Sequence, residues 1–252
     1  MKLSVVILTK NEEEKIEQAI RSALFADEIL IIDDYSTDKT LEIAQKYKVN
    51  FAQRSLNNNF SQQRNFALNQ AKGDWIFFLD ADEVITSELK VEIKTILSKN
   101  SSFCAFYIKR RDIFWGRVLK HGELKTAYHK GIIRLIKKNS GIWEGNVHER
   151  FVTTKITGRL KGFINHYSHN SIKEFIIDIN NYSTIRAKEL QKKCLETNIF
   201  QILFYPIAKF KMNYIIKLGF LDGVPGFIYS FMMSFHSFLV RAKLYQYTRL
   251  EN

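Results

Sequence analysis

The sequence predicts an α/β fold with a doubly wound, mostly parallel sheet, followed by a helical C-terminal extension. Three observations lead to this prediction. Short apolar runs alternate with amphipathic segments over the first hundred residues, polar residues follow these runs, and the last eighty residues have helical periodicity. With 252 residues, the chain is long enough for one such domain and an appendage.

The first hundred residues alternate between buried strands and helices that pack on a sheet. The run Leu3–Thr9 is almost continuously apolar, as in a strand buried on both faces. Asn11 and Glu14 then have the spacing of a capping box, and apolar residues recur at helical intervals from Ile16. The same alternation predicts further strands at 28–33, 49–52 and 74–79, and helices at 37–48, 61–71 and 86–97.

The rest of the chain changes character twice. Shorter β-like pieces at 103–111, 131–136 and 151–155 predict an antiparallel section, and helical segments follow at 171–193, 199–218 and 223–244. We therefore expect a sheet domain over 1–168, with halves 1–100 and 101–168, and a basic, aromatic helical extension over 169–252.

Composition excludes several classes of protein. With 46% hydrophobic and 25% charged residues, 11 Gly and 2 Pro, the chain is not collagen-like, low-complexity or wholly disordered. Two cysteines, Cys104 and Cys194, give neither a disulfide framework nor a Cys-rich zinc module and fit a reducing compartment. The N-terminus resembles a first strand and not a signal peptide, so we expect synthesis in the cytosol.

The positive charge belongs to the second part of the chain. Residues 1–100 contain 13 Lys/Arg and 16 Asp/Glu, whereas residues 101–252 contain 25 and 10. The basic part therefore predicts an anionic partner, and nucleic acid, a phosphorylated substrate and the negative inner leaflet of a membrane all satisfy this.

The final helical segment is rich in aromatic residues but interrupted by polar ones. Its uninterrupted apolar length falls short of the roughly 20 residues that a spanning helix requires. Aromatic side chains beside lysines and arginines suit a helix that lies among lipid headgroups. The alternative, a core helix packed on the sheet domain, is equally open at this point.

Carboxylates gather where two predicted strands end. Asp33, Asp34 and Asp38 follow the second strand, and Asp80 and Asp82 follow the fourth. Ligands of such sheets bind beyond the carboxyl ends of the strands, and carboxylates there can hold Mg²⁺ or Mn²⁺ against a diphosphate. An Asp-x-Asp pair alone is a weak signal, since both residues can simply be solvated in a turn, but so many carboxylates at one edge favour a bound cation.

Four blocks of sequence together resemble a known family. They are Val5 to Glu12, Ile32 to Thr40, Gln63 to Asn65, and Ala71 to Glu83. In this order and at these strand ends, they resemble the inverting family 2 glycosyltransferases of GT-A fold. Arg134-Leu135, Trp143 to Glu149 and the basic aromatic tail resemble the branch that adds sugars to the lipopolysaccharide core.

The resemblance implies a role for each matching residue. Thr9 and Glu12 would line the nucleotide pocket, Asp34 or Asp33 would bind the uracil, Arg64 would brace the base or diphosphate, Asp80 would meet the ribose or sugar, and Asp82 would hold the metal. Residues 1–100 would then be the nucleotide-binding half of the catalytic domain and 101–168 its acceptor half. The processive signature Gln-x-x-Arg-Trp is missing, so a cellulose-synthase-like polymerase is not expected.

Two positions depart from the family pattern. Tyr35 stands where the family commonly has Gly, and Lys39 stands where a second Gly is common. The backbone path of this loop is therefore open from the sequence.

Inversion requires a carboxylate that takes the proton of the acceptor hydroxyl. Glu149 is the candidate, in a segment where Trp143 to Val147 could form a sugar platform. Glu144 is the reserve, and Glu149 could instead pair with Arg150 or Arg134 at a strand end. His148 could orient groups or assist a metal, or could be structural. Four other histidines lack the paired helical spacing of a zinc site and are expected to be structural, namely His121, His129, His166 and His169.

The resemblance thus implies a metal-dependent, inverting hexosyltransferase, expected to be peripheral to the inner face of the plasma membrane. Its partners would be a UDP-linked nucleotide-sugar donor and a cell-envelope glycan acceptor such as the lipopolysaccharide core. The alternatives are a non-catalytic adaptor that binds membrane or another anion, and a metal-dependent phosphotransferase. Nucleic acid is not expected because neither a helix-turn-helix nor an aromatic and basic strand platform is recognisable.

Overall fold

A computed structural model describes residues 1–57, 59–99, 101–145 and 149–249, which form two compact units. The first unit comprises Met1–Arg111 and Lys130–His166, and the second comprises Asp112–His129 and the chain from Tyr167. The expected division at residue 168 differs in one respect, because 112–129 belong with the C-terminal helices. The apolar side chains of this segment, among them Phe114 and Leu119, form one core with Phe175 and Met232.

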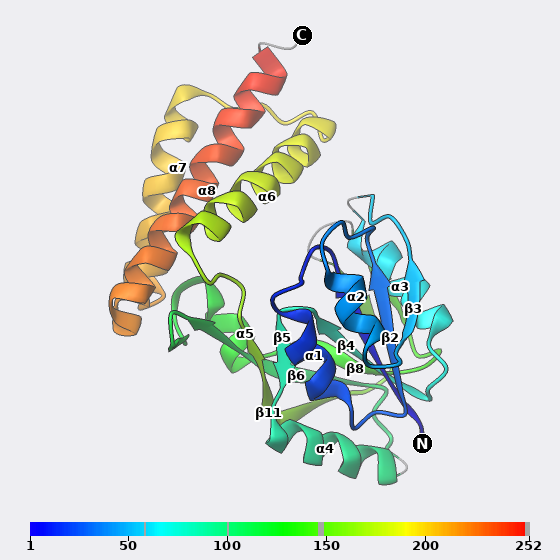
Figure 1. Ribbon diagram of the computed structural model, residues 1–252. Helices are drawn as coiled ribbons and strands as arrows, with labels where there is room; N and C mark the ends of the chain where they lie inside the picture. Colours follow the sequence, from blue (N-terminus) through cyan, green and yellow to red (C-terminus); the bar gives the residue numbers. More distant parts are fainter. Residues whose placement is uncertain (58, 100, 146–148, 250–252) are drawn as a thin grey trace. The chain divides into compact units, whose positions relative to one another are not determined.

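The main sheet has a parallel and an antiparallel part (Figure 1). Its strands are β1 (Leu3–Thr9), β2 (Glu28–Asp33), β3 (Asn50–Gln53), β4 (Trp75–Asp80), β5 (Glu83–Ile85), β6 (Ala105–Phe114), β8 (Ile132–Lys137) and β11 (Thr157–His166). The end of β6, from Asp112, belongs to the second unit. They follow the order β3-β2-β1-β4-β8-β6-β11-β5. The first four are parallel, whereas β8 is antiparallel to β4 and β6, and β5 is antiparallel to β11. The predicted α/β class is confirmed.

Helices cover both faces of the sheet. They are α1 (Ile16–Ala23), α2 (Thr40–Gln45), α3 (Phe60–Gln70) and α4 (Ser87–Ser98). Because successive side chains of a strand point to opposite faces, Val5 packs in one core with α1 and α4, and Val6 packs in another with α3. This explains why β1 is apolar along nearly its whole length. A separate hairpin pairs β9 (Ile142–Glu144) with β10 (Arg150–Val152).

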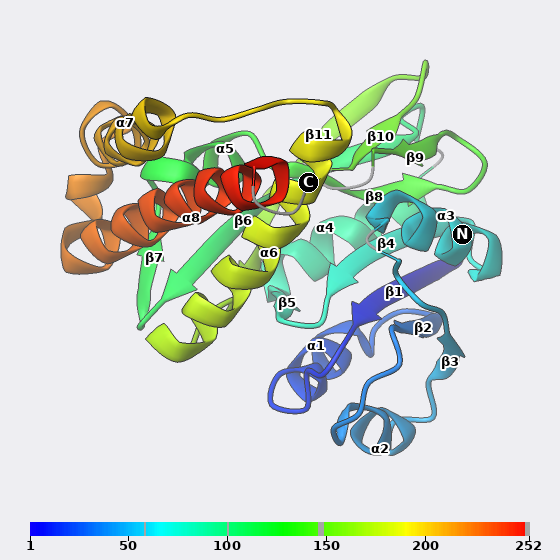
Figure 2. The same cartoon turned by 90° about the horizontal axis from the view of Figure 1, so that it is seen from above.

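The second unit is mainly helical. Its elements are β7 (Arg117–Leu119), a 3₁₀ turn (Gly122–Leu124), α5 (Lys125–His129), α6 (Ile172–Lys192), α7 (Ile199–Lys211), a π turn (Met212–Ile216), a 3₁₀ turn (Gly219–Asp222) and α8 (Gly223–Arg249). In both views α8 lies between α6 and α7 (Figures 1 and 2). The predicted helix over 199–218 is present to Ile216, but its geometry changes from α to π after Lys211.

One helical segment is more apolar than expected. Gly219–Arg249 is long and apolar enough, by length and composition, to cross a membrane, and within the described residues it is the only such segment. The expectation that its apolar length falls short of a span is thus wrong on these two criteria. Buried core helices pass the same test, so length and composition do not decide where this helix lies.

Candidate functional site

The acidic strand ends lie on one edge of the sheet. Thr9, the last residue of β1, is in register with Asp33 of β2, and the preceding Leu8 is in register with Asp80 of β4. Since β1 lies between β2 and β4 and neighbouring strands are spaced by about 4.8 Å, the two aspartates are about 10 Å apart along the sheet. We call Asp33, Asp34, Asp80 and Asp82 the acidic edge; a nucleoside diphosphate is large enough to span it.

Hydrogen bonds join the loops that follow β1 and β2. The Asn11 backbone N–H donates to Ser36 Oγ at 2.9 Å, and the Thr37 N–H donates to Asn11 Oδ1 at 2.8 Å. Asn11 therefore links two loops, and the predicted capping box is wrong. Helix α1 begins at Ile16, and no side-chain hydrogen bond caps it.

The two neighbouring aspartates after β2 have different roles. Asp33 is fully buried, and its carboxylate accepts from the backbone and hydroxyl of Ser36 and from Gln53 Nε2. Asp34 is partly exposed and accepts from Lys10 Nζ at 2.8 Å and from the Leu56 N–H at 3.0 Å. Asp33 thus shapes the turn, and Asp34 is the carboxylate that a ligand can reach.

The two departures from the family pattern also differ. Tyr35 has a φ of +54°, in the left-handed region that favours glycine, whereas Lys39 has an ordinary φ of −79°. The backbone at position 35 therefore takes a conformation for which Gly is the natural residue, although the chain carries Tyr. At position 39 the φ angle is one that any residue adopts, so glycine is not favoured there.

The residues expected to line the nucleotide pocket lie at the end of β1. Thr9 is buried, and its hydroxyl has no hydrogen-bond partner among the described residues. Such an orphaned buried hydroxyl is uncommon and points to a ligand contact. Glu12 follows in the loop, where its backbone N–H donates to Thr40 Oγ1 at 2.8 Å and its carboxylate lies 3.8 Å from Lys15 Nζ.

Two arginines hold the carboxylate of Asp80. Arg134 donates to both oxygens, at 3.1 and 2.5 Å, and Arg64 Nη2 donates to Oδ1 at 3.2 Å. Burial alone would raise the pKa of Asp80, but the charges of Arg134 and Arg64 outweigh it and hold that pKa far below its usual range. Asp80 is therefore a carboxylate that two cations neutralise, and much of its hydrogen-bonding capacity is used before any sugar arrives.

A buried ion pair between Glu83 and Arg134 helps to position Asp80. Glu83 is fully buried; it accepts from Arg134 Nη2 at 2.7 Å and from the backbone N–H of Asp80 at 3.0 Å. Arg110 Nη1 lies 3.8 Å from the same carboxylate. Sequence reasoning assigned no role to Glu83, because a third acid after Asp-x-Asp resembles another turn residue.

Asp82 pairs with a histidine from a strand that the sequence analysis missed. His166 Nε2, at the end of β11, lies 3.1 Å from Asp82 Oδ2. Burial by itself would raise the pKa of Asp82, but the charge and hydrogen bond of His166 lower it. Treating His166 as structural was thus incomplete, since it contacts the predicted metal ligand. The alternation of Leu160, Gly162 and Ile164 with polar or exposed neighbours was the available signal for β11.

The donor set fits a cation only with help from a substrate. Within the described ranges, no group of three or more His, Cys, Asp or Glu side chains could hold a metal ion. Asp82 offers a carboxylate oxygen, and His166 offers an imidazole nitrogen once Nε2 is deprotonated and no longer donates to Asp82. Mg²⁺ and Mn²⁺ commonly complete their coordination with water and substrate phosphate, so this pair fits a cation that binds together with a diphosphate.

Glu149 reaches the acidic edge through Arg64. Its Oε1 accepts from Arg64 Nε at 2.7 Å, an ion pair that the sequence did not predict. Glu149 retains partial exposure, and the reserve candidate Glu144 is exposed on β9. His148, with Asn146 and Val147, lies outside the described residues.

Trp143 lies in the core beside Arg64. Its indole is buried, packs edge-on against Phe78 and Phe151, and lies 5.0 Å from the Arg64 guanidinium carbon. The expected sugar platform is therefore wrong for Trp143, whose ring is covered by its neighbours and cannot face a pyranose.

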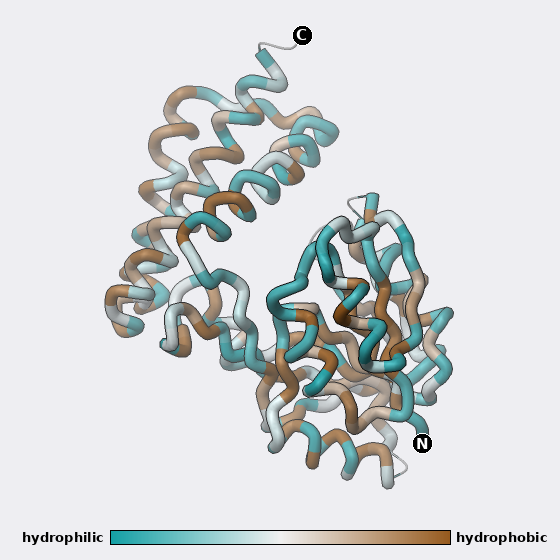
Figure 3. Tube along the Cα trace, in the orientation of Figure 1, coloured by the Kyte–Doolittle hydropathy of each residue, from teal (hydrophilic) through white to brown (hydrophobic). Residues whose placement is uncertain are grey.

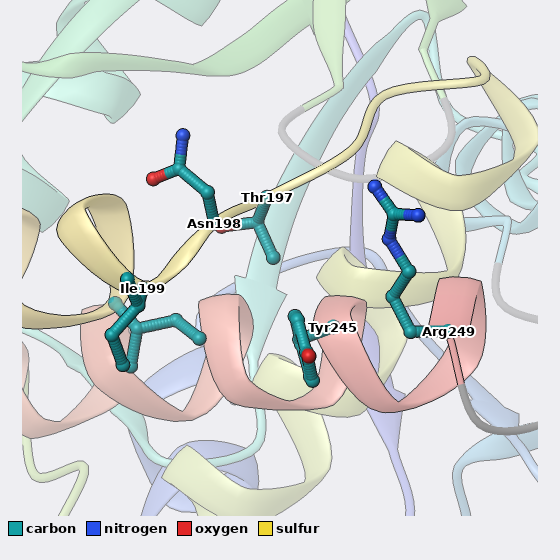
Figure 4. Close-up of a pocket in the computed structure, with 6 residues that line it drawn as sticks. Thr197, Asn198, Ile199, Tyr245 and Arg249 are labelled. Atoms are coloured by element: carbon teal, nitrogen blue, oxygen red, sulfur yellow. The ribbon is translucent and has the colours of Figure 1, made fainter.

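A cavity in the helical unit differs from the acidic edge in the side chains that line it (Figure 4). It measures about 380 Å³ and is lined by Thr197, Asn198, Ile199, Ile202, Tyr245 and Arg249. Arg249 already donates to Glu196 at 2.8 Å, and the lining contains no carboxylate. The candidate site for a nucleotide and a cation is therefore the acidic edge.

Comparisons with known proteins agree with this assignment. The model of the family described as "Glycosyl transferase family 2" matches residues 4–160. An uncharacterized glycosyltransferase of Rickettsia typhi is 30% identical, over 96% of this chain and 86% of the relative. The lipopolysaccharide core biosynthesis glycosyltransferase LpsC of Rhizobium meliloti is 27% identical, over 97% and 92%.

Solved structures show the same fold. The crystal structure of S. aureus TarS 1-349 in complex with UDP has a TM-score of 0.51 at 18% identity, over 100% of this chain and 92% of that one. The complex of the same fragment with UDP-GlcNAc has a TM-score of 0.50 at 18% identity, over 98% and 91%. Fold and site together define an enzyme of the GT-A class. The chain belongs to glycosyltransferase family 2.

Proposed function

We propose that the protein is an inverting hexosyltransferase that uses a UDP-linked sugar and extends a cell-envelope glycan, the lipopolysaccharide core. The observation that carries the donor assignment is the shared edge of Thr9, Asp34 and Asp80. The TarS structures in complex with UDP and UDP-GlcNAc support a uridine nucleotide, and the relative LpsC supports the acceptor class. The excess of basic residues beyond residue 100 fits a phosphorylated acceptor.

The nucleotide would bind across the ends of β1 and β2. Asp34 is the accessible carboxylate for the imide N–H of uracil, and the orphaned Thr9 hydroxyl supplies a further hydrogen bond. Arg64 offers a cation for the diphosphate, and its Nη1 is buried with no hydrogen-bond partner among the described residues. Asp33 keeps the turn in shape and does not contact the base.

Asp82 and His166 would hold Mg²⁺ or Mn²⁺ together with the donor. When bound, the cation would neutralise the negative charge that grows on the departing diphosphate. Arg134 and Arg64 neutralise Asp80, which leaves Asp82 as the carboxylate at this strand end without an arginine partner among the ion pairs of the described residues.

Glu149 would act as the base. As the acceptor oxygen forms its bond to the anomeric carbon, the bond to the diphosphate breaks on the opposite face and the hydroxyl proton passes to Glu149. For this to happen, the Glu149 oxygen held by Arg64 must be free or its second oxygen must receive the proton. A diphosphate that binds Arg64 through Nη1, which has no hydrogen-bond partner among the described residues, would leave the Arg64–Glu149 pair in place, so the second oxygen of Glu149 is the one that would receive the proton.

Titration with UDP tests the donor site. We expect Mn²⁺ to increase UDP affinity at least tenfold, and Asp82→Ala to remove this increase while metal-free UDP binding remains. Glu42→Ala is the matched control, because Glu42 is an exposed carboxylate on α2 that pairs with Lys46 one helical turn away. If Asp82→Ala keeps the full effect of Mn²⁺, the metal assignment fails. If UDP does not bind the wild-type protein, the donor assignment fails.

A further inference from the structure

We propose that the second unit lies on the surface of an anionic lipid bilayer and inserts the outer face of α7 among the lipids. This outer face consists of Phe200, Leu203, Phe204 and Ile207. The inference concerns where the protein binds and does not depend on which sugar it transfers.

The spacing of these residues places them on one side of the helix. Positions i, i+3, i+4 and i+7 share a face, and Phe200 and Phe204 are 67% and 60% exposed. Their rings are stacked with centroids 6.5 Å apart. Helix α7 is largely apolar (Figure 3), yet within the described chain it has no buried side chain, so all of its apolar residues are at least partly open to solvent. An isolated exposed Leu is ordinary, but a whole exposed apolar helix face indicates an interaction site.

Apolar exposure continues beyond α7 into the turns that lead to α8. The exposed side chains there include Ile215, Ile216, Phe220, Leu221 and Val224. Together with the outer face of α7 they make an apolar surface that no other part of the second unit covers in the described structure. Aromatic and aliphatic side chains of this kind are typical of helices that lie in a bilayer interface.

The charge of the same segment favours an anionic partner. Residues 199–249 contain six Lys/Arg and a single carboxylate, Asp222. Asp222 is buried and accepts from the backbone and the ring of His121, so it does not contribute an exposed negative charge. Lys209, Lys211 and Lys217 lie at the end of α7 and in the following turn, beside the apolar surface.

This charge pattern argues against a second copy of the chain as the occupant. In a two-fold dimer the same patch faces itself, so Lys211 and Lys217 of both copies would lie close together. Lys209 already pairs with Glu123 at 2.8 Å, whereas no such ion pair is found for Lys211 or Lys217 among the described residues. Anionic lipid headgroups supply the missing negative charge. A bilayer therefore suits both the apolar and the charged parts of the surface.

The contacts of α8 favour a helix that does not cross the membrane. Lys243 of α8 donates to Asn180, Ser183 and Thr184, all of which belong to α6. Helix α6 is highly charged, with Lys173, Glu174, Asp178, Arg186, Lys188, Glu189 and Lys192 along its length. If α8 crossed a bilayer, either these contacts would break or a charged helix would enter the hydrocarbon region, which is costly. Binding through α7 leaves them intact.

Vesicle sedimentation tests the proposal with the full chain. We expect binding to vesicles of phosphatidylglycerol and phosphatidylcholine, and at least tenfold weaker binding to vesicles of phosphatidylcholine alone. The double variant Phe200→Ser/Phe204→Ser should bind the anionic vesicles at least tenfold more weakly, and Lys211→Glu/Lys217→Glu should lose the preference for phosphatidylglycerol. Val91→Ser is the matched control, because Val91 is a similarly exposed apolar residue on α4 of the first unit.

Four results would overturn the proposal. These are equal binding to both kinds of vesicle, undiminished binding of the Phe200→Ser/Phe204→Ser variant, resistance of the bound protein to carbonate extraction, and a dimer in sedimentation velocity that the same variant dissolves. The third would indicate a spanning helix and the fourth a second copy of the chain. UDP affinity, measured in every variant, should stay unchanged, so failure of vesicle binding is distinguishable from failure of the donor site.

Discussion

Arg64 joins Glu149 to Asp80. Its Nε lies 2.7 Å from Glu149 Oε1 and its Nη2 lies 3.2 Å from Asp80 Oδ1, so one guanidinium binds the candidate base and a strand-end carboxylate at once. The guanidinium is buried near the rings of Phe78 and Trp143, which fix its position. A bidentate arrangement of this kind depends on the planar fork of arginine.

We expect Arg64→Lys to lower kcat and raise the KM for the donor, each by about tenfold or more. A lysine keeps the charge, but a single ammonium group cannot hold two carboxylates in the same geometry. Steady-state kinetics with the donor varied measure both constants. Unchanged kinetics in Arg64→Lys would show that the link between Glu149 and Asp80 has no part in the reaction.

We expect Glu149→Gln to reduce kcat by at least a hundredfold and to leave UDP affinity within about twofold, because it removes the proton acceptor and no nucleotide contact. Glu144→Gln is the comparison and should keep most of the wild-type kcat. Single-turnover transfer and UDP titration separate the two effects. The reverse result, with Glu144→Gln inactive and Glu149→Gln active, would assign the base to Glu144.

We expect Asp80→Asn to lower the free energy of unfolding at pH 7 by about 3 kcal/mol, because two buried guanidiniums each lose one of the two carboxylates that they contact. The pKa of Asp80 is depressed in the folded state, so its contribution is present above the unfolded pKa of about 4 and is lost as the pH falls towards the folded value. Chemical denaturation of both proteins at several pH values measures the difference. A difference that stays constant down to pH 2 would contradict this account.

The parallel part of the sheet was predictable because a strand that is buried on both faces is apolar at successive positions, and such a run is easy to recognise in the sequence. Each of β1, β2 and β4 is a short apolar run that ends in polar residues, and the acidic edge follows from those ends. The strands of the antiparallel part are harder to recognise, because they are shorter or less apolar. Strand β5 has three residues, and β11 combines two glycines with charged residues on its outer face.

The partners of the acidic edge were less predictable for the same reason. Arg134 and His166 come from β8 and β11, and only the pairing of these strands brings them to Asp80 and Asp82. Spacing along the sequence contains no information on that pairing. The different roles of Asp33 and Asp34 likewise depend on which side chain points into the protein, which adjacent identical residues do not reveal.

Tyr35 and Lys39 offer a matched pair of glycine substitutions. Tyr35 has a left-handed φ, which costs a non-glycine residue about 1 to 2 kcal/mol, so Tyr35→Gly should raise the free energy of unfolding by about 0.5 kcal/mol after the entropy loss of glycine. Lys39 has an ordinary φ, and Lys39→Gly should lower the same free energy by about 0.5 to 1 kcal/mol. Denaturant titration measures both, and destabilisation by Tyr35→Gly would show that the tyrosine ring makes a compensating contact.

Thr9 and Thr40 separate a ligand contact from a structural one. Both hydroxyls are buried, but Thr40 Oγ1 donates to Asp38 Oδ1 at 2.5 Å and accepts from the Glu12 N–H, whereas Thr9 Oγ1 has no partner among the described residues. Thr40→Val should therefore lower the free energy of unfolding by about 1 to 3 kcal/mol.

Thr9→Val should leave that free energy unchanged or raise it by about 1 kcal/mol, because it removes a buried polar atom that lacks a hydrogen bond. If the Thr9 hydroxyl binds the nucleotide, the same substitution should weaken UDP binding about tenfold, which corresponds to about 1.4 kcal/mol. Calorimetric titration with UDP and denaturant titration of the free protein measure the two quantities independently. Lower stability with unchanged UDP affinity would mean that Thr9 supports the fold and that the nucleotide lies elsewhere on the edge.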